Sequence, residues 1–398
     1  MQRLAKFAKT IRNNWKKSTV GFVALSACKE AAQYGDMSLS MDRNPTVVTV
    51  ILNPVANKRG SKRDYEKYCE PLLHLAGLQV DVVQTTAEGS AKEIVETLRG
   101  TEAIIVAGGD GTLSETVTGL LRRTDDANRF PIGVLPLGRT NTIGNTIFPN
   151  TGNNIEKAKQ LINASMAIIK WNTEWKDAMK IEPIADDEHS KPIFALSSIE
   201  WGAFRDVIAK KDKYWFTGGL RNYASYIFNG YKDNLTWNCS GTIKYTPPCT
   251  GCSNCSPKRK AIQRKWSFFT SPTHKEQEEV KINPQCSNAE ELCFKSCDFK
   301  IQTPNVDNAL QEPSLSLVLG KHNYSYTEFV AEGWKRLKGV ANNQNVILAR
   351  TIELIPKESS SDNEVIEIDS EEFDVKPVRI TLLPKIVRLF CLPQIENC

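Results

Sequence analysis

The sequence predicts a two-domain protein with an α/β N-terminal domain and a mainly antiparallel β C-terminal domain. Up to about residue 170, short apolar runs end in polar or glycine-rich turns and alternate with helical periods, as in a parallel sheet covered by helices. Beyond that point the helical periods become rare, and short β-type runs follow one another between polar or proline-bearing turns.

The first predicted strand is Thr46–Leu52, whose sequence TVVTVIL is rich in β-branched residues. It stops at Asn53-Pro54 and leads into a polar loop. A later strand, Ile132–Pro136, ends in the same way and is followed by the polar turn 137–142. Since parallel sheets bind ligands at the carboxyl ends of their strands, we expect these turns to lie side by side around a ligand.

Between these two strands, the run Ala103–Glu115 (AIIVAGGDGTLSE) combines a short buried strand, a glycine-rich turn and a helix start. Thr112 and Glu115 have the spacing of a capping box, and the residues after them give the helix one apolar face. Three glycines are expected to let the backbone turn sharply beside a bulky anion: Gly108, Gly109 and Gly111.

The amide groups and the positive dipole end of that helix start suit a phosphate group. Asp110, in the middle of the turn, would repel a bare phosphate, so we expect it beside a divalent cation or a hydroxyl proton. This combination indicates phosphoryl transfer, with an ordinary tight turn as the alternative. The P-loop pattern and the G-x-S-x-G elbow of serine hydrolases are absent from the sequence, and its four histidines form no cluster.

These residues resemble the diacylglycerol kinase catalytic-domain superfamily, which includes lipid and sphingosine kinases and is related to the NAD kinases. The matching segments are Asn53-Pro54, Gly108–Thr112 with Glu115, and Pro136–Gly138 with Thr140-Asn141. Within the superfamily the chain is similar to the mitochondrial acylglycerol kinases, or multi-substrate lipid kinases. The resemblance implies the two-domain lipid kinase fold, with a C-terminal β-sandwich and an active site in the cleft.

The resemblance also implies which residues form the site. Asp110 is expected to organise Mg²⁺, directly or through water, with ATP as the co-substrate. The nucleotide-binding residues would be Asn53, Gly108, Gly109, Gly111, Thr112, Thr140, Asn141 and Arg221. Arg221 ends a tract that looks like the sphingosine kinase segment whose arginine contacts ATP phosphates, and a surface arginine is the alternative.

Two carboxylates are candidates for the catalytic base. Asp110 is one, but an aspartate beside a metal is usually too acidic to be a strong base. The segment Ile368–Glu371 matches the late Asp-Gly-Glu segment of bacterial lipid kinases, whose Glu is the base, with Ser370 in place of glycine. The resemblance therefore implies that Glu371 is catalytic beside Asp110, and a solvated acidic turn is the alternative.

The predicted domains are a basic amphipathic membrane or targeting segment (1–45), a diacylglycerol-kinase-like α/β catalytic domain (46–169) and a β-rich C-terminal domain (170–398). Residues near 240–312 lack steady periodicity and are expected to form a mobile insertion. The remaining expectations in the last domain are a helix over Asn222–Tyr231 and strands within Ile193–Ile199, Leu235–Asn238, Ser314–Leu319, Val346–Leu348 and Val378–Leu383.

Basic side chains dominate the start of the chain. The formal net charge is +5 overall, yet seven Lys and Arg residues and no acidic residue precede Glu30. With Leu4, Phe7, Ile11 and Trp15 spaced by three or four, the segment predicts an amphipathic helix on an anionic membrane surface, or a mitochondrial address. This uneven charge argues against a nucleic-acid partner. The resemblance implies a peripheral protein of the mitochondrial inner membrane, on the intermembrane-space side.

Six of the eleven cysteines gather in or beside the expected insertion. Cys249, Cys252 and Cys255 form a C-x2-C-x2-C pattern, and Cys286, Cys293 and Cys297 follow on its far side. Four thiolates from the two groups could hold a structural zinc ion, and disulfides would form in an oxidising compartment. Reduced thiols are the third interpretation, and the sequence leaves all three open.

The predicted function is that of an ATP- and Mg²⁺-dependent lipid kinase. By resemblance it converts monoacylglycerol to lysophosphatidic acid and diacylglycerol to phosphatidic acid. A sphingosine or ceramide kinase and an NAD kinase are the enzymatic alternatives. The alternative from another class, implied by the animal members of the family, is a kinase-independent role in the inner-membrane translocase for carrier proteins, with translocase subunits as partners.

Overall fold

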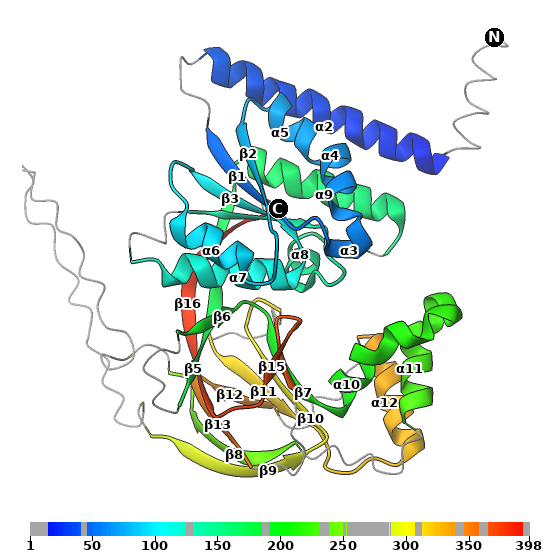
Figure 1. Cartoon of the computed structure of the whole chain (residues 1–398), viewed down its shortest axis with the longest axis vertical. Coiled ribbons are helices and arrows are strands. Elements are labelled where there is room, and N and C mark those ends of the chain that lie inside the picture. The colour runs from blue at the N-terminus through cyan, green and yellow to red at the C-terminus, as the bar shows by residue number, and fades with distance from the viewer. Residues whose placement is uncertain are drawn as a thin grey trace, which may run out of the picture.

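The computed structural model describes residues 15–40, 46–124, 130–150, 152–184, 191–230, 239–249, 252, 286, 288–306, 313–339, 346–357 and 365–392 (Figure 1). Its first half runs through α2 (Trp15–Ser40), β1 (Val47–Leu52), α3 (Ala56–Arg59), α4 (Ser61–Tyr68), α5 (Glu70–Leu75), β2 (Gln79–Gln84), α6 (Ser90–Thr97), β3 (Ala103–Gly108), α7 (Asp110–Arg122), β4 (Ile132–Pro136), α8 (Thr142–Ile147) and α9 (Asn154–Ile169). The three strands predicted here, β1, β3 and β4, are confirmed.

Four parallel strands in the order β2-β1-β3-β4 form the centre of this half. Alternate side chains of β1 and β3 face opposite layers of helices. Val50 and Ile105 pack with α2, α5 and α9, whereas Ile51 and Ile104 pack with α6 and α7. Because both faces of the sheet are covered, its strands read as nearly continuous apolar runs.

The second half contains β5 (Thr173–Pro183), β6 (Ile193–Ala195), β7 (Ser198–Gly202), α10 (Ala203–Ala209), the 3₁₀ segment η2 (Lys210–Leu220), α11 (Arg221–Asn229), β8 (Cys239–Thr246), β9 (Glu290–Ser296), β10 (Asp298–Gln302), β11 (Leu315–Leu319), α12 (Tyr326–Leu337), β12 (Val346–Ala349), β13 (Thr351–Pro356), β14 (Val365–Ile368), β15 (Glu371–Asp374) and β16 (Val378–Phe390). These strands pair antiparallel with one another, which confirms the predicted fold class.

Two sheets enclose the core of this half. One is the six-stranded sheet β12-β11-β10-β7-β14-β15, and the other contains β16, β13, β8 and β9. Trp201 and Phe299 from the first pack against Ile243 and Ile352 from the second. The long strand β16 also pairs with β5 over most of its length and reaches β4, where Leu389 lies opposite Ile132. One sheet therefore continues from the first half of the chain into the second (Figure 1).

Most of the strands predicted in this half are confirmed. β11, β12 and β16 cover three of the expected runs, and the run Ile193–Ile199 is divided between β6 and β7. The helix expected over 222–231 is α11, which packs with α10 and α12 around Phe204, Tyr226 and Phe329. The strand expected over Leu235–Asn238 lies outside the described residues. Within 240–312, the described residues include β8, β9 and β10, and the others of that segment lie outside the description.

The N-terminal prediction is covered only in part. Leu4, Phe7 and Ile11 lie outside the described residues, and Trp15 opens α2. This helix packs on the first domain through Ala27 and Ala31, and Lys170 forms an ion pair with Glu30 at 2.7 Å. In the part of the chain that the structure describes, no helix combines the length and apolar character that crossing a bilayer requires.

Candidate active site

The glycine-rich turn joins β3 to α7 at the carboxyl edge of the parallel sheet. We expected its glycines to permit a sharp turn, but none of Gly108, Gly109 and Gly111 has a left-handed backbone. Glycine is required at these positions because the packing leaves no space for a side chain. A Cβ on Gly109 would lie 3.0 Å from the Thr140 carbonyl oxygen, and one on Gly138 would lie 2.2 Å from the Gly109 Cα. The turns after β3 and β4 are therefore in backbone contact.

The capping box expected from Thr112 and Glu115 is wrong. The residue before α7 is Gly109, and no side chain caps the helix. Glu115 instead accepts hydrogen bonds from the amides of Gly89 (2.7 Å) and Ala91 (3.0 Å), at the start of α6. A carboxylate is favourable there because it meets the positive end of that helix. Among the described residues, no side chain therefore caps the first turn of α7.

Asn53, directly after β1, organises the neighbouring loop. Its Oδ1 accepts hydrogen bonds from the amides of Val55 and Ala56, and its Nδ2 donates to Thr112 Oγ1 at 3.1 Å. Beyond it, Asn57 and Lys58 both have left-handed backbones, as does the residue that follows them. Strained conformations of this kind persist where the surrounding structure fixes them, often at functional sites.

Asp110 is the first residue of α7 and is almost fully buried. Its carboxylate accepts hydrogen bonds from the Thr142 amide (2.7 and 2.9 Å) and from Thr142 Oγ1 (2.9 Å), while its own amide donates to the Thr140 carbonyl. Burial raises the pKa of Asp110 to about 6, the bonds from Thr142 oppose that rise, and the nearby Asp369 adds to it.

A tight hairpin between β14 and β15 brings in the second predicted carboxylate. Ile368 pairs with Glu371, so only Asp369 and Ser370 form the connection, and both have left-handed backbones. A type I′ turn requires this conformation at both positions. The turn directs Glu371 against the start of α7, where a Cβ on Gly111 would lie 2.6 Å from Glu371 Oε1.

Asp369 anchors this hairpin. Its buried carboxylate accepts hydrogen bonds from the backbone amides of Leu196 (2.6 Å), Ser197 (2.9 Å) and Ser198 (3.0 Å), in the turn between β6 and β7. The hydroxyl of Ser197 donates to it as well. The alternative of a solvated acidic turn is therefore wrong for Asp369, which is 4% exposed.

Glu371 lies in a negative environment. Burial raises the pKa of Glu371 to about 8, and the carboxylates of Glu115, Glu88 and Asp369 add to that rise, with Lys92 opposing it. The two carboxyl groups of the site thus differ in pKa, with Asp110 the more acidic. A pair of titratable groups separated in this way is typical of sites that assign different roles to two acids.

A cavity of about 390 Å³ opens between these groups. The residues that follow the four parallel strands all contribute to it: Asn53 after β1, Thr85 after β2, Gly109 after β3 and Gly138 after β4. Among the other residues that line it are Asp110, Gly111, Thr112, Glu115, Arg139, Thr140 and Glu371. The sequence-predicted residues are therefore largely gathered around one space, in the position that parallel α/β sheets use for ligands.

Three of the predicted site residues do not line this cavity. Gly108 is the last residue of β3, and its carbonyl accepts hydrogen bonds from the amides of Leu137 and Gly138. Asn141 uses its side chain on the same turn, accepting from the Gly138 amide and donating to the Gly138 carbonyl. Arg221 stands at the start of α11, apart from the glycine turn.

Arg221 is linked to the cavity through a residue that the sequence did not single out. Asp212, in η2, forms an ion pair with Arg221 at 3.6 Å and a shorter one with Arg139 at 2.6 Å. Lys211 lies close to both arginines: burial lowers its pKa, and Arg139 and Arg221 lower it further. Three cations with one carboxylate give this rim of the cavity a positive charge.

Arg205, at the start of α10, supports the hairpin of β14 and β15. The buried guanidinium group pairs with Glu367 on β14 at 2.9 Å and with Glu372 on β15, and also with Asp206. Asp177 on β5 accepts a hydrogen bond from the Lys385 amide at the irregularity in β16.

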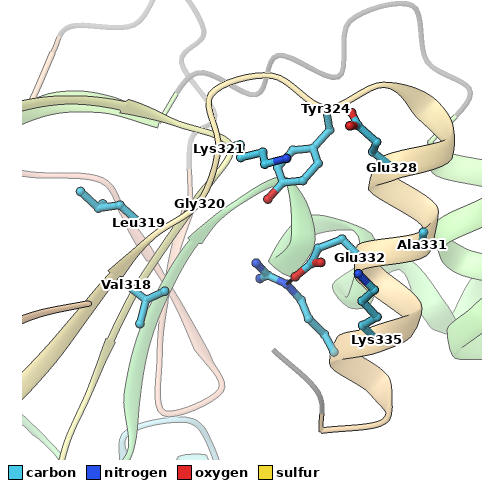
Figure 2. A pocket seen from close by; sticks show the side chains of 10 residues that line it. Val318, Leu319, Gly320, Lys321, Tyr324, Glu328, Ala331, Glu332 and Lys335 are labelled. Carbon is cyan, nitrogen blue, oxygen red and sulfur yellow. Dashed lines mark hydrogen bonds and ion pairs between the residues drawn. The ribbon is translucent and has the colours of Figure 1, made fainter. Parts of the chain in front are cut away.

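A second cavity, of about 250 Å³, lies between the end of β11 and α12 (Figure 2). Arg336, which lines it, pairs with Glu332 at 3.5 Å and with Asp298 at 2.7 Å, and lies over the ring of Phe204. None of the sequence-predicted site residues lines it. We therefore take the cavity at the glycine turn as the candidate active site.

The chain matches known proteins over most of its length. Residues 47–171 match the family model of the diacylglycerol kinase catalytic domain, and residues 196–397 match that of the acylglycerol kinase C-terminal region. The chain is 32% identical to a mitochondrial acylglycerol kinase of Homo sapiens over 98% of its length and 97% of the relative's. It is 33% identical to the corresponding protein of Xenopus laevis, covering 99% and 96%. A solved diacylglycerol kinase structure from Bacillus anthracis shares the fold, with a TM-score of 0.54 and 17% identity over 87% of this chain and 97% of that one.

Proposed function

The chain belongs to the acylglycerol kinase family, and on this premise we propose that it transfers the terminal phosphoryl group of ATP to the hydroxyl group of a membrane glycerolipid. It is a lipid kinase, and monoacylglycerol and diacylglycerol are the substrates proposed. One observation carries the proposal beyond family membership. The glycine turn, Asp110 and Glu371 border a single cavity at the carboxyl ends of the parallel strands.

The start of α7 is where we propose that the ATP phosphates bind. The amides of Gly111 and Thr112 precede the first intrahelical hydrogen bond, and no side chain caps them. Amides in this position, together with the helix dipole, favour a phosphate group. Asn53 holds Thr112 from one side, and the Thr140 carbonyl holds the Asp110 amide from the other. The turn is thus fixed before a nucleotide arrives, which lowers the entropic cost of binding.

Arg139, Lys211 and Arg221 supply the positive charge that this arrangement needs. Asp212 ties the two arginines together beside the cavity. A triphosphate carries more negative charge than the helix start alone can neutralise, and guanidinium groups bind phosphate oxygens with two donors at once. We propose that Arg139 binds the phosphates at the rim of the cavity. Arg221 would bind them as well, by exchanging its ion pair with Asp212 for one with a phosphate oxygen.

Asp110 has the chemistry expected of a Mg²⁺ ligand. Its carboxylate is held by Thr142, and its raised pKa reflects burial that a nearby cation would offset. Mg²⁺ is commonly bound through one or two carboxylates together with substrate phosphates. When bound, the ion would neutralise charge on the transferred phosphoryl group.

Glu371 is the base that we propose. Its pKa of about 8 suits a group that takes up the proton of an alcohol near neutral pH, and its oxygen lies against the first turn of α7. Asp369 fixes the hairpin that carries it. In this assignment Asp110 remains ionised and organises the phosphates, while Glu371 orients the lipid hydroxyl and accepts its proton.

The lipid substrate requires contact with a bilayer, and α11 with η2 offers a suitable surface. Large apolar side chains project from it, with Trp215 at 76% and Phe216 at 65% exposed. We define the docking patch as Trp215, Phe216, Leu220 and Phe228 with Lys210 and Lys213. Exposed aromatic groups among lysines suit an anionic membrane surface. Asp212, in the same segment, contacts Arg139 at the cavity, so docking would bring the active site to the lipid.

The chain is a mitochondrial protein, like the vertebrate relatives that it matches. We propose that it is attached peripherally to the inner membrane and faces the intermembrane space, as its basic N-terminal segment and the docking patch suggest. Contact with subunits of a carrier-protein translocase remains a prediction. The comparisons favour the kinase over a kinase-independent function and over sphingosine, ceramide or NAD as the substrate.

The direct test is an assay with labelled ATP and Mg²⁺ against a lipid panel. The panel contains monoacylglycerol, diacylglycerol, sphingosine and ceramide, with NAD as a soluble competitor. We expect label in the glycerolipids, and its loss in Asp110→Asn. The control is Asp81→Asn, since Asp81 is exposed on β2. Label in NAD alone would overturn the proposal. Carrier import rescued by Asp110→Asn would show that a translocase function is separate from the kinase.

A further inference from the structure

Three cysteines that take no part in the candidate active site come together at one end of the hairpin formed by β8 and β9. The sulfur atoms of Cys249, Cys252 and Cys286 all lie within 4.8 Å of one another. Cys252 and Cys286 are buried, at 3% and 4% exposed, and Cys249 is half-buried. None of the three lines the cavity at the glycine turn.

The pairing of β8 with β9 explains how residues so far apart in the sequence meet. Tyr245 lies opposite Glu290 at the last register position of the two strands. Cys249 follows β8 by three residues, and Cys286 precedes β9 by four, so the antiparallel ladder delivers them to the same place. The C-x2-C spacing then brings Cys252 back toward its neighbour.

Arg350 adds a second observation at this site. Its Nη1 donates to Cys286 Sγ at 3.2 Å, and its Nη2 donates to the Cys286 carbonyl at 3.1 Å. The backbone of Arg350 is fixed between two sheet strands, since its amide donates to Thr246 and its carbonyl accepts from Leu382. The guanidinium group therefore places a positive charge against one sulfur of the cysteine group.

From these contacts we infer that Cys249, Cys252 and Cys286 bind a structural zinc ion as thiolates. A C-x2-C pair joined by a distant cysteine is a common ligand pattern for structural zinc. With Zn–S distances of about 2.3 Å in a tetrahedral site, ligand sulfurs lie about 3.8 Å apart. The three sulfurs, all within 4.8 Å of one another, are therefore close to the spacing that the ion requires.

Three thiolate ligands and one divalent zinc ion would together carry one net negative charge. Arg350 lies where it neutralises that charge. Among the described residues, no fourth Cys, His, Asp or Glu joins the group, so the remaining zinc position belongs to water or a further donor.

The ion would hold the two ends of the segment between Cys249 and Cys286 together. It would stabilise the outer hairpin of the second domain, which lies away from α6 and α7 (Figure 1). This role is independent of the kinase function proposed above, because neither β8 nor β9 supplies a residue to the cavity.

The test is the zinc content of the full-length chain, purified under reducing conditions and washed with a weak chelator. Elemental analysis should find about one zinc per chain, and each of Cys249→Ser, Cys252→Ser and Cys286→Ser should lower that value to a small fraction. Cys293→Ser is the matched control, because Cys293 is exposed on β9 and outside the group. We expect it to retain full zinc.

A measurement on the wild-type chain covers the case in which a variant fails to fold. A mercurial thiol reagent should release the zinc in step with thiol modification. The Co²⁺-substituted chain should show the intense thiolate-to-cobalt absorption of a tetrahedral site. Absence of zinc, zinc unaffected by all three substitutions, or a disulfide between two of these cysteines found by mass spectrometry would each overturn the inference.

Discussion

Oε1 of Glu371 lies 2.6 Å from the point that a Cβ on Gly111 would occupy. The start of α7 and the β14–β15 hairpin, which are 260 residues apart, are therefore in contact with no space for a side chain between them. Glycine is needed here because a side chain would collide with Glu371. Its backbone conformation does not require glycine, since it is not in the left-handed region. A catalytic carboxylate at this point would lie beside the amides that we propose bind the phosphates.

The first prediction follows from which atoms a new methyl group would meet. Gly111→Ala would collide with the Oε1, Cγ and Cδ atoms of Glu371, all in a flexible side chain. The carboxylate should swing away while the fold remains intact. We expect the rate of lipid phosphorylation to fall about 10²-fold or more, in line with loss of a general base, with a nearly unchanged melting temperature.

Gly138→Ala is the contrasting variant. Its Cβ would lie 2.2 Å from the Gly109 Cα and 2.7 Å from the Gly109 nitrogen, and backbone atoms have no rotamer to change. We expect this variant to lose stability as well as activity. Gly21→Ala, where nothing lies within 4 Å, is the neutral control. If Gly111→Ala kept full activity, Glu371 would not act at the position described here.

The parallel sheet could be predicted because its strands carry the simplest of signals. β1, β3 and β4 are buried on both faces, so their sequences are continuous apolar runs with clear ends. β2 was missed because four of its six residues are exposed and three of these are polar, as in QVDVVQ. β9 was missed for a similar reason, since EELCFKS holds charges on its open face.

The site residues that could be predicted also differ from those that could not in how directly the sequence marks their position. Asp110 and Asn53 follow buried strands directly, so position along the chain was enough to predict where they would lie. Asp212 and Thr142 act through tertiary contacts that no spacing reveals. Asn141 was expected to bind the nucleotide, yet its side-chain amide forms hydrogen bonds with the backbone of Gly138. The two-residue turn Asp369-Ser370 was missed because it lacks the glycine that usually marks a hairpin of this type.

The second prediction concerns the pH dependence of the reaction. If Glu371 is the base, kcat/KM should rise with pH up to about 8 and then level, because only the ionised carboxylate accepts a proton. Glu371→Gln should lower activity about 10²–10⁴-fold and remove that rise. Asp374→Asn is the control, since Asp374 is exposed on the same strand. A rise centred near 6 that survives in Glu371→Gln would assign the base to Asp110 instead.

The third prediction is a stability effect with the opposite sign to the activity effect. The pKa of Glu371 rises from 4.5 to about 8 on folding, so the folded chain binds this proton more tightly than the unfolded chain. Its contribution to stability is present below pH 4.5 and is lost as the pH rises through 8. Glu371→Gln cannot ionise, and should be more stable than the wild type in alkaline buffer.

We expect the gain to exceed about 1 kcal/mol at roughly pH 9, because one pKa unit corresponds to about 1.4 kcal/mol. Thermal melts of both proteins across the pH range would measure it. The difference should vanish only below pH 4.5, where the carboxyl group of Glu371 is neutral in both the folded and the unfolded chain. A constant difference at all pH values would indicate a packing effect and contradict the raised pKa.

The fourth prediction tests the anchor of the hairpin. Asp369→Asn would turn an amide NH₂ group toward the donors on Leu196 or on Ser197 and Ser198. A buried donor left without an acceptor costs about 1–3 kcal/mol. Urea unfolding should show that loss, and activity should fall too, because Glu371 is carried by the same turn. An unchanged unfolding midpoint would contradict the anchoring role.

The fifth prediction separates membrane docking from chemistry. Trp215→Ser with Phe216→Ser removes the two most exposed aromatic groups of the docking patch, at 76% and 65% exposed. Burying one such side chain contributes about 1.5–3 kcal/mol, and about 1.4 kcal/mol is tenfold in affinity. We therefore expect at least a tenfold weaker affinity for anionic vesicles in a flotation assay. Phosphorylation of a short-chain, water-soluble acylglycerol should be unchanged, since neither residue lines the cavity.

Val82→Ser, which alters an exposed apolar residue on β2, is the control. Vesicle binding that is unaffected by the double substitution, or equal loss of activity on the soluble substrate, would contradict the patch as the docking surface.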